Sequence, residues 1–107
     1  MENFNQVIIR DTTLRDGLQH EEHYIPLKQR FQVMKALAES GIKYFEVGSL
    51  SHPIYLPQFK EIDDFLENYL PEMGEQDMEY TVLALNAKAV ERVENLLRKG
   101  VRIDRVL

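Results

Sequence analysis

Two carboxylates and an arginine stand close together near the start of the chain, in the segment from Asp11 to Asp16. Carboxylate oxygens bind hard divalent cations such as Mg²⁺ and Mn²⁺. A fixed guanidinium, here that of Arg15, stabilises negative charge that develops on an enolate or carboxylate oxygen. These residue types at this spacing are suited to holding a divalent cation with an anionic oxygen beside it.

Each of these residues also has a purely structural interpretation, and the spacing leaves both open. Asp11 can cap a turn, and Arg15 can form a structural ion pair with Glu46. Asn86 follows an apolar run and precedes a helical pattern, so it can be the N-cap of a helix.

The three histidines are a weak signal for zinc. His20 and His23 are three residues apart in a segment rich in acids, and His52 stands before a proline. Exposed or turn histidines are more common than metal ligands. We therefore expect exposed or turn positions for all three.

The elements that position these residues alternate along the chain. Short apolar runs, rich in β-branched and aromatic residues, predict strands at 7–11, 43–47, 80–85 and 102–107. Apolar residues at three- and four-residue spacing predict helices at 26–41, 58–70 and 87–99. We expect a loop at 12–24, a helix start at Pro26, a capping Gly41, and a helix stop at Pro71.

Each predicted helix carries one apolar stripe that we expect to face the core. The first stripe comprises Leu27, Phe31, Met34, Leu37 and Ala38. The second comprises Phe59, Ile62, Phe65, Leu66 and Tyr69, and the third Val90, Val93, Leu96 and Leu97.

This alternation predicts an α/β fold with a parallel sheet and right-handed crossovers. The carboxyl ends of parallel strands meet at one mouth, where (β/α) proteins place their active sites. A (β/α)8 barrel needs about 250 residues. Because the 107 residues supply three strand-helix units and a fourth strand, we favour the N-terminal part of such a barrel over a complete four-stranded domain.

Composition excludes several function classes. The net charge is −5 and there is no basic run, so we expect no nucleic-acid partner. The absence of cysteine excludes disulfides and thiolate zinc sites. No apolar stretch approaches the roughly 20 residues that span a bilayer, and the polar N-terminus lacks a signal-peptide pattern. We expect a cytoplasmic protein with no membrane partner.

The segment Asp-Thr-Thr-Leu-Arg-Asp-Gly-Leu-Gln-His-Glu (11–21) resembles the opening motif of the DRE-TIM metallolyase superfamily. Its members include hydroxymethylglutaryl-CoA lyase, the isopropylmalate and homocitrate synthases, and the carboxyltransferase domain of pyruvate carboxylase. The resemblance continues through Phe-Glu-Val-Gly-Ser-Leu-Ser-His-Pro (45–53), Leu-Pro-Gln (56–58) and the third strand with Asn86. It implies that 1–107 is the N-terminal part of a TIM-barrel catalytic domain.

The resemblance also implies roles by position. Arg15 matches the catalytic arginine that steadies the enolate or carbonyl oxygen, and Asp16 matches the ligand of a divalent metal, Mg²⁺ or Mn²⁺. Glu46 matches the glutamate that supports the arginine, and Asp11 an acid that assists in the site. The residues expected to line the substrate are Gln19, Ser49 and Asn86.

Two branches of the superfamily remain open. Arg-Asp-Gly-Leu-Gln followed by an acid, with Ser-His-Pro and Leu-Pro-Gln, is similar to the lyases, whereas synthases usually carry Glu where Leu18 stands. The lead-in Asp-Thr-Thr-Leu is similar to the synthases. The lyase branch implies retro-aldol cleavage of a 3-hydroxyacyl-CoA, and the synthase branch condensation of acetyl-CoA with a 2-keto acid. A full-length enzyme is expected to be a homo-oligomer.

A third interpretation is a non-catalytic partial barrel that needs a partner. The superfamily completes its metal site with a later His-x-His pair, and its lyases use a later cysteine. The 107 residues contain neither. We therefore expect the isolated 107 residues neither to bind metal tightly nor to catalyse.

Overall fold

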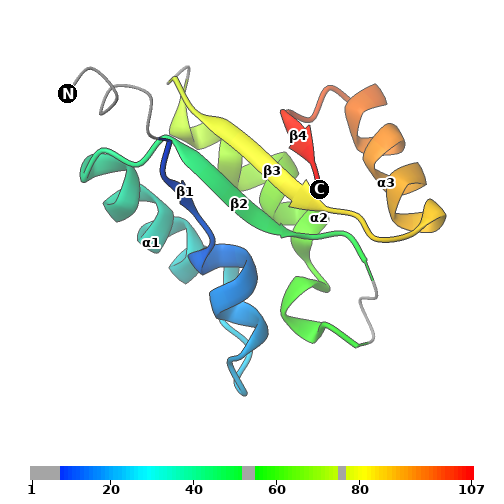
Figure 1. The fold of residues 1–107 in the computed structure, drawn as a ribbon, viewed down its shortest axis with the longest axis horizontal. Helices are drawn as coiled ribbons and strands as arrows, with labels where there is room; N and C mark the ends of the chain where they lie inside the picture. Colours follow the sequence, from blue (N-terminus) through cyan, green and yellow to red (C-terminus); the bar gives the residue numbers. More distant parts are fainter. Residues whose placement is uncertain (1–7, 52–54, 75–76) are drawn as a thin grey trace.

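Four parallel strands form one sheet in the computed structural model, which describes residues 8–51, 55–74 and 77–107 (Figure 1). The strands are β1 (Arg10–Asp11), β2 (Tyr44–Ser49), β3 (Glu79–Leu83) and β4 (Arg105–Val106). They lie in the order β1-β2-β3-β4, and each neighbouring pair is parallel. The predicted α/β architecture with a parallel sheet is therefore confirmed.

The first crossover contains α1 (Leu27–Glu39), which starts directly after Pro26. Gly41 follows the helix with a φ of 105°, a left-handed conformation that glycine adopts without steric cost. Of the predicted stripe, Leu27 and Met34 are buried and the other three residues are partly buried. The prediction of this helix is confirmed to within two residues at its C-terminal end.

The second crossover is a succession of short helical pieces rather than one continuous helix. They are a 3-10 turn (Pro57–Phe59), α2 (Ile62–Asp64), a π-type turn (Phe65–Tyr69) and a second 3-10 turn (Leu70–Met73). Pro71 does not stop the helical segment as predicted, because it lies within the last turn. A proline is tolerated at the start of a turn, where its missing N–H would have no acceptor.

The third crossover contains α3 (Ala87–Arg98), and here the predicted stripe is partly wrong. Ala89, Val93 and Leu96 are buried, whereas Val90 is 44% and Leu97 48% exposed. The buried residues are four and three positions apart, so they form one stripe along the helix. Val90 and Leu97 each follow a buried residue by one position and therefore lie on the flank of this stripe. No described element covers that flank.

The core lies between the sheet and the helical layer. Its most buried side chains come from β2, β3 and the second crossover: Phe45, Val47, Tyr80, Val82, Phe59, Ile62, Phe65 and Leu66. Figure 1 shows α2 behind β2 and β3, on one face of the sheet. The predicted apolar stripe of the second crossover is therefore the part of the helical layer on which the central strands pack.

Both ends of the sheet differ from prediction. β1 begins only at Arg10. Ile8 and Ile9 are 58% and 64% exposed, so the predicted burial of the first apolar run is wrong for these two residues. Val7 lies outside the described residues. β4 is limited to Arg105–Val106. Among the described strands β1 and β4 each have one neighbour. Apolar side chains at these edges lack the second flanking strand that buries a central strand.

Candidate active site at the carboxyl ends of the strands

The chain leaves β1 through a wound turn rather than the open loop predicted for 12–24. Both oxygens of the Asp11 carboxylate accept hydrogen bonds from Thr13, from its backbone N–H (2.9 Å) and its hydroxyl (3.2 Å). The Thr12 carbonyl then accepts the backbone N–H groups of Arg15, Asp16 and Gly17 at 2.8–3.2 Å. Asp11 thus starts the turn that carries Arg15, Asp16 and Gln19.

This turn, Thr13–Gly17 and its continuation to Gln19, has one apolar and one polar side. Leu14 and Leu18 are four residues apart, are 2% and 8% exposed, and belong to the core. The polar side chains of Arg15 and Asp16 therefore point away from the core. Because helical residues four apart lie on one face, Gln19 and His20 lie beside them.

Arg15 and Glu46 form the central contact of the site. The Arg15 Nε and Nη2 groups both donate to Oε1 of Glu46, at 3.0 and 2.8 Å. The side chains are 22% and 10% exposed, so the ion pair is partly shielded from water. Charge-assisted hydrogen bonds of this kind are shorter and stronger than neutral ones. The structure therefore joins the turn after β1 to the middle of β2.

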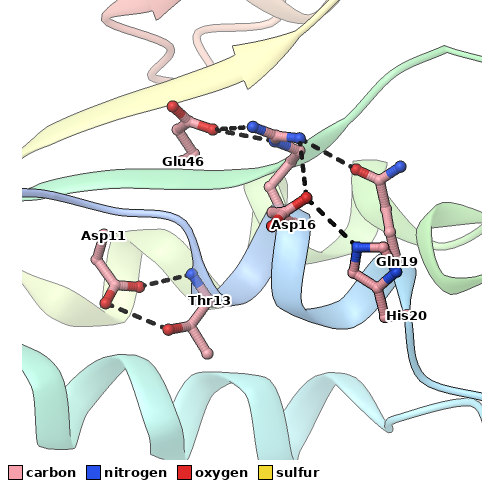
Figure 2. Close-up of polar contacts among 7 residues, drawn as sticks. Asp11, Thr13, Asp16, Gln19, His20 and Glu46 are labelled. Carbon is pink, nitrogen blue, oxygen red and sulfur yellow. Dashed lines mark hydrogen bonds and ion pairs between the residues drawn. The ribbon is translucent and has the colours of Figure 1, made fainter.

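Asp16 and Gln19 lie at the outer side of the Arg15 guanidinium, and His20 lies next to Asp16 (Figure 2). Arg15 Nη1 donates to Oε1 of Gln19 at 3.2 Å and lies 3.7 Å from Oδ1 of Asp16. His20 Nε2 lies 3.6 Å from the same Asp16 oxygen, and its side chain is 79% exposed, as predicted for this histidine. His52 lies outside the described residues.

The other three candidate residues do not join this group. Figure 2 shows Asp11 paired with Thr13, apart from the cluster around Glu46. Ser49 is 1% exposed, and its Oγ accepts the backbone N–H of Ser51 at 3.1 Å. Asn86 is the N-cap of α3, and its Oδ1 accepts the backbone N–H of Ala89 at 2.8 Å.

The described residues do not make a complete metal site by themselves. Within 8–51, 55–74 and 77–107, no three His, Asp or Glu side chains converge as metal ligands. The Glu46 carboxylate binds Arg15 and the Asp11 carboxylate binds Thr13. Asp16, with a side chain 56% exposed, is the carboxylate of the cluster that can act as a single ligand.

Arg30 and Gln58 are buried polar residues whose contacts the sequence pattern did not predict. Arg30 of α1 is 1% and Gln58 5% exposed, and the Arg30 Nη2 group donates to Oε1 of Gln58 at 3.2 Å. Burial lowers the pKa of Arg30 from its usual value. The spacing held a signal, because Arg30 falls between Leu27 and Met34 on the inward face of the helix.

The class of this protein follows from fold, site and comparisons together. The parallel strand-helix units match a portion of a TIM barrel, because the solved structures with a similar fold are barrels of that kind. The model of the HMGL-like family matches residues 6–102. The chain therefore belongs to the HMGL-like family, within the DRE-TIM metallolyase superfamily.

Individual relatives come from both branches of the superfamily. A hydroxymethylglutaryl-CoA lyase of Bacillus subtilis is 28% identical over 96 residues, which are 90% of this chain and 30% of that protein. A 2-isopropylmalate synthase of Buchnera aphidicola is 42% identical over 65 residues, which are 60% of this chain and 12% of the synthase. The crystal structure of hydroxymethylglutaryl-CoA lyase from Pseudomonas aeruginosa superposes with a TM-score of 0.73 at 28% identity, covering 89% of this chain and 30% of that one.

The chain spans about 30% of the length of the lyases that it matches. Among the described residues, no helix is long and apolar enough to cross a membrane.

Proposed function

We propose that the full-length protein is a divalent-metal-dependent carbon–carbon lyase that cleaves a 3-hydroxyacyl-CoA by retro-aldol chemistry. Residues 1–107 would supply the part of its active site that contains Arg15. The observation that carries this proposal is the Arg15 guanidinium, which Glu46 holds through two N–H groups while its Nη1 faces Asp16 and Gln19.

Arg15 is suited to stabilise an oxygen that becomes negatively charged. A guanidinium has five N–H donors, of which three bond Glu46 and Gln19 among the described residues. The remaining donors are available to a carbonyl oxygen of the substrate, or to the enolate that forms when the carbon–carbon bond breaks. Because Glu46 fixes the guanidinium before substrate arrives, little reorganisation accompanies this stabilisation.

Asp16 is the ligand that this part of the chain would contribute to a divalent metal. A bound metal ion would supply Lewis-acid polarisation of the substrate's carbonyl and hydroxyl oxygens. Gln19, which is fixed by Arg15, would orient the substrate through its amide group. The base that removes the hydroxyl proton would come from another part of the full-length protein.

The lyase branch is favoured over the synthase branch by Leu18 and by the extent of the matches. Leu18 is 8% exposed and packs in the core, so a carboxylate is absent from the position where the synthases usually have one. The match to the lyase from Bacillus subtilis covers 90% of the chain, and the match to the synthase from Buchnera aphidicola covers 60%. The 42% identity within the shorter match keeps a Claisen-type synthase as the second candidate.

An assay of the purified full-length protein tests both candidates. We expect acyl-CoA release from 3-hydroxyacyl-CoA substrates such as hydroxymethylglutaryl-CoA, and no thiol release from acetyl-CoA with a panel of 2-keto acids. The reverse result would establish the synthase reaction. Activity that survives thorough chelation would contradict the metal requirement.

The role of Arg15 is tested by Arg15→Ala. Removing one preorganised donor at a developing oxyanion costs about 10²–10³ in kcat, so we expect a loss of at least that size. Arg98→Ala, at an exposed position on α3, is the matched control and should leave turnover unchanged. Unchanged turnover in Arg15→Ala would remove Arg15 from the mechanism.

A further inference from the structure

Gln58 belongs to the Leu-Pro-Gln segment, which the proposed reaction leaves without a role. Its amide group bonds at both ends to a chain segment more than thirty residues earlier. The Nε2 group donates to the backbone carbonyls of Glu21 (3.2 Å) and His23 (2.5 Å). Oε1 accepts the backbone N–H of Ile25 at 3.0 Å. A single buried side chain thus fixes three backbone groups of residues 21–25.

Arg30 reinforces the same segment from α1. Its Nε group donates to the Ile25 carbonyl at 2.9 Å, and its Nη2 group to Oε1 of Gln58 at 3.2 Å. The guanidinium carbon lies 5.0 Å from the centre of the Tyr24 ring, a distance at which a cation and an aromatic face attract each other. Burying a charge is costly unless it is hydrogen-bonded, and these contacts offset part of that cost, whereas the buried Nη1 group has no hydrogen-bond partner among the described residues.

The segment fixed in this way directly follows the turn that carries Arg15, Asp16 and Gln19. Residues 12–25 form the connection between β1 and α1, and Gln58 stands at the end of the connection after β2. The Arg15–Glu46 ion pair joins the first of these connections to β2 itself. The hydrogen bonds of Gln58 join the two connections to each other, at residues 21–25 of the first and at residue 58 of the second. The connection is therefore held on both sides of Asp16.

We propose that Gln58, supported by Arg30, is a positioning residue that locks the connection between β1 and α1 in the conformation presenting Asp16 and Gln19 to the mouth. This inference rests on the proposed function, because it assigns a purpose to the orientation of the Asp16 carboxylate. Gln58 does not touch the reacting atoms; it acts through the backbone of residues 21–25.

The physical basis is the number of backbone groups that depend on one buried amide. Without Gln58, the partly buried carbonyls of Glu21 and His23 and the N–H of Ile25 lose a hydrogen-bond partner, which is unfavourable. The segment is then expected to leave this conformation to reach water. Outer-shell residues that orient a metal ligand typically change metal affinity or activity by about 10–100-fold when they are removed.

The test uses the full-length protein with Gln58→Met, which keeps the side-chain length and removes all its hydrogen bonds. Gln32→Met, on the exposed face of α1, is the matched control. The measurements are amide hydrogen exchange of residues 18–26, Mn²⁺ affinity, kcat and KM. We expect faster exchange confined to 18–26, about 10-fold weaker Mn²⁺ binding, and a fall in kcat larger than any rise in KM.

Should Gln58→Met fail to fold, Gln58→Glu decides the question. It keeps the acceptor for Ile25 and Arg30 and removes the donors to Glu21 and His23, so smaller changes in the same directions are expected. Unchanged exchange in 18–26 would overturn the proposal. Faster exchange with unaltered Mn²⁺ affinity and kcat would overturn the positioning role. If the unmodified protein neither binds Mn²⁺ nor turns over, the proposed function fails, and the exchange result alone decides whether Gln58 holds the segment.

Discussion

At the scale of single residues, Glu46 determines how Arg15 can act. Its carboxylate binds Nε and Nη2 of Arg15 with one oxygen and is itself 10% exposed in its side chain. Removing one member of a shielded ion pair leaves the other charge without compensation. The arginine would then be free to turn toward water or toward Asp16.

If the proposed reaction is correct, we predict that Glu46→Gln lowers kcat/KM of the full-length protein by about 10–100-fold, because the neutral amide keeps its size but no longer fixes the guanidinium by charge. Steady-state kinetics measure the effect. The control is Glu67→Gln, which removes a surface ion pair with Lys99 remote from the site. Equal kinetics for the two variants would contradict the supporting role of Glu46.

Tyr24 gives a prediction about pH. Burial, together with its hydrogen bond to Glu61, raises the pKa of Tyr24 to about 12, above the usual value of 10.0. The folded protein therefore keeps the proton over a range in which the unfolded chain loses it. This contribution to stability is complete below pH 10 and is lost as the pH rises toward 12.

We expect Tyr24→Phe to reduce the fall in unfolding free energy between about pH 10 and pH 12. Urea unfolding at several pH values across this interval measures it. Tyr55→Phe, at an exposed tyrosine, is the control. A pH dependence that is the same in the Tyr24 variant and the unmodified protein would show that Tyr24 does not carry the effect.

At the scale of elements, the contact of β2 with the second crossover depends on Gly48. The register between β2 and β3 shifts at Glu46–Gly48, so an irregularity immediately follows the glutamate that holds Arg15. A Cβ built on Gly48 would lie 2.4 Å from Cδ1 and 3.2 Å from Cγ1 of Ile62. Ile62 is fully buried, so its side chain would have to shift within the core to admit the new methyl group.

Gly48→Ala is therefore predicted to destabilise the protein by about 1–3 kcal/mol, the usual cost of overpacking a core. Chemical denaturation measures the change. Gly17→Ala serves as control, because its nearest neighbour would be the Thr13 methyl group at an ordinary 3.7 Å. Equal stability of the two variants would mean that the packing around Ile62 relaxes at no cost.

Asn86 offers a test that separates a cap from a substrate contact. Because its Oδ1 caps α3, Asn86→Ala should cost about 1 kcal/mol of stability, whereas Asn86→Asp keeps the cap. If Asn86 also lines the substrate, as the family resemblance implies, Asn86→Asp should retain stability and lose activity. Full activity in Asn86→Asp would assign Asn86 to the cap alone.

At the scale of the whole molecule, the sheet has apolar residues at both edges. Ile8 and Ile9 precede β1, Val106 lies in β4 and Leu107 follows it, and their exposed fractions are 58%, 64%, 45% and 48%. Exposed strand edges with apolar side chains pair readily with other chains. In a barrel, further strands would cover both edges.

We predict that residues 1–107 in isolation self-associate, and that Ile9→Lys with Val106→Lys shifts them toward monomer. Light scattering after size-exclusion chromatography measures the mass as a function of concentration. The comparison is a double variant with lysine at Val33 and Val90, apolar positions exposed on helices rather than at strand edges. A clean monomer of the unmodified 107 residues would contradict this prediction and the partial-barrel interpretation.

The sequence by itself determined the class of fold, the order of the elements and the core stripe of the second crossover. These depend on local periodicity, on proline and glycine at helix ends, and on apolar runs, all of which act within a few residues. It also singled out the segment 11–21 as the one that carries Arg15 and Asp16, but it predicted an open loop where the structure has a helical turn that buries Leu14 and Leu18.

Only the tertiary structure decided which polar residues share an environment. Arg15 meets Glu46 across 31 positions, and Gln58 meets Glu21, His23 and Ile25 across more than thirty. It also decided that Ile8, Ile9 and Val90 are exposed although their pattern predicts burial. Burial and hydrogen bonding depend on which elements pack against a residue, and that information lies in distant parts of the chain rather than in the local pattern.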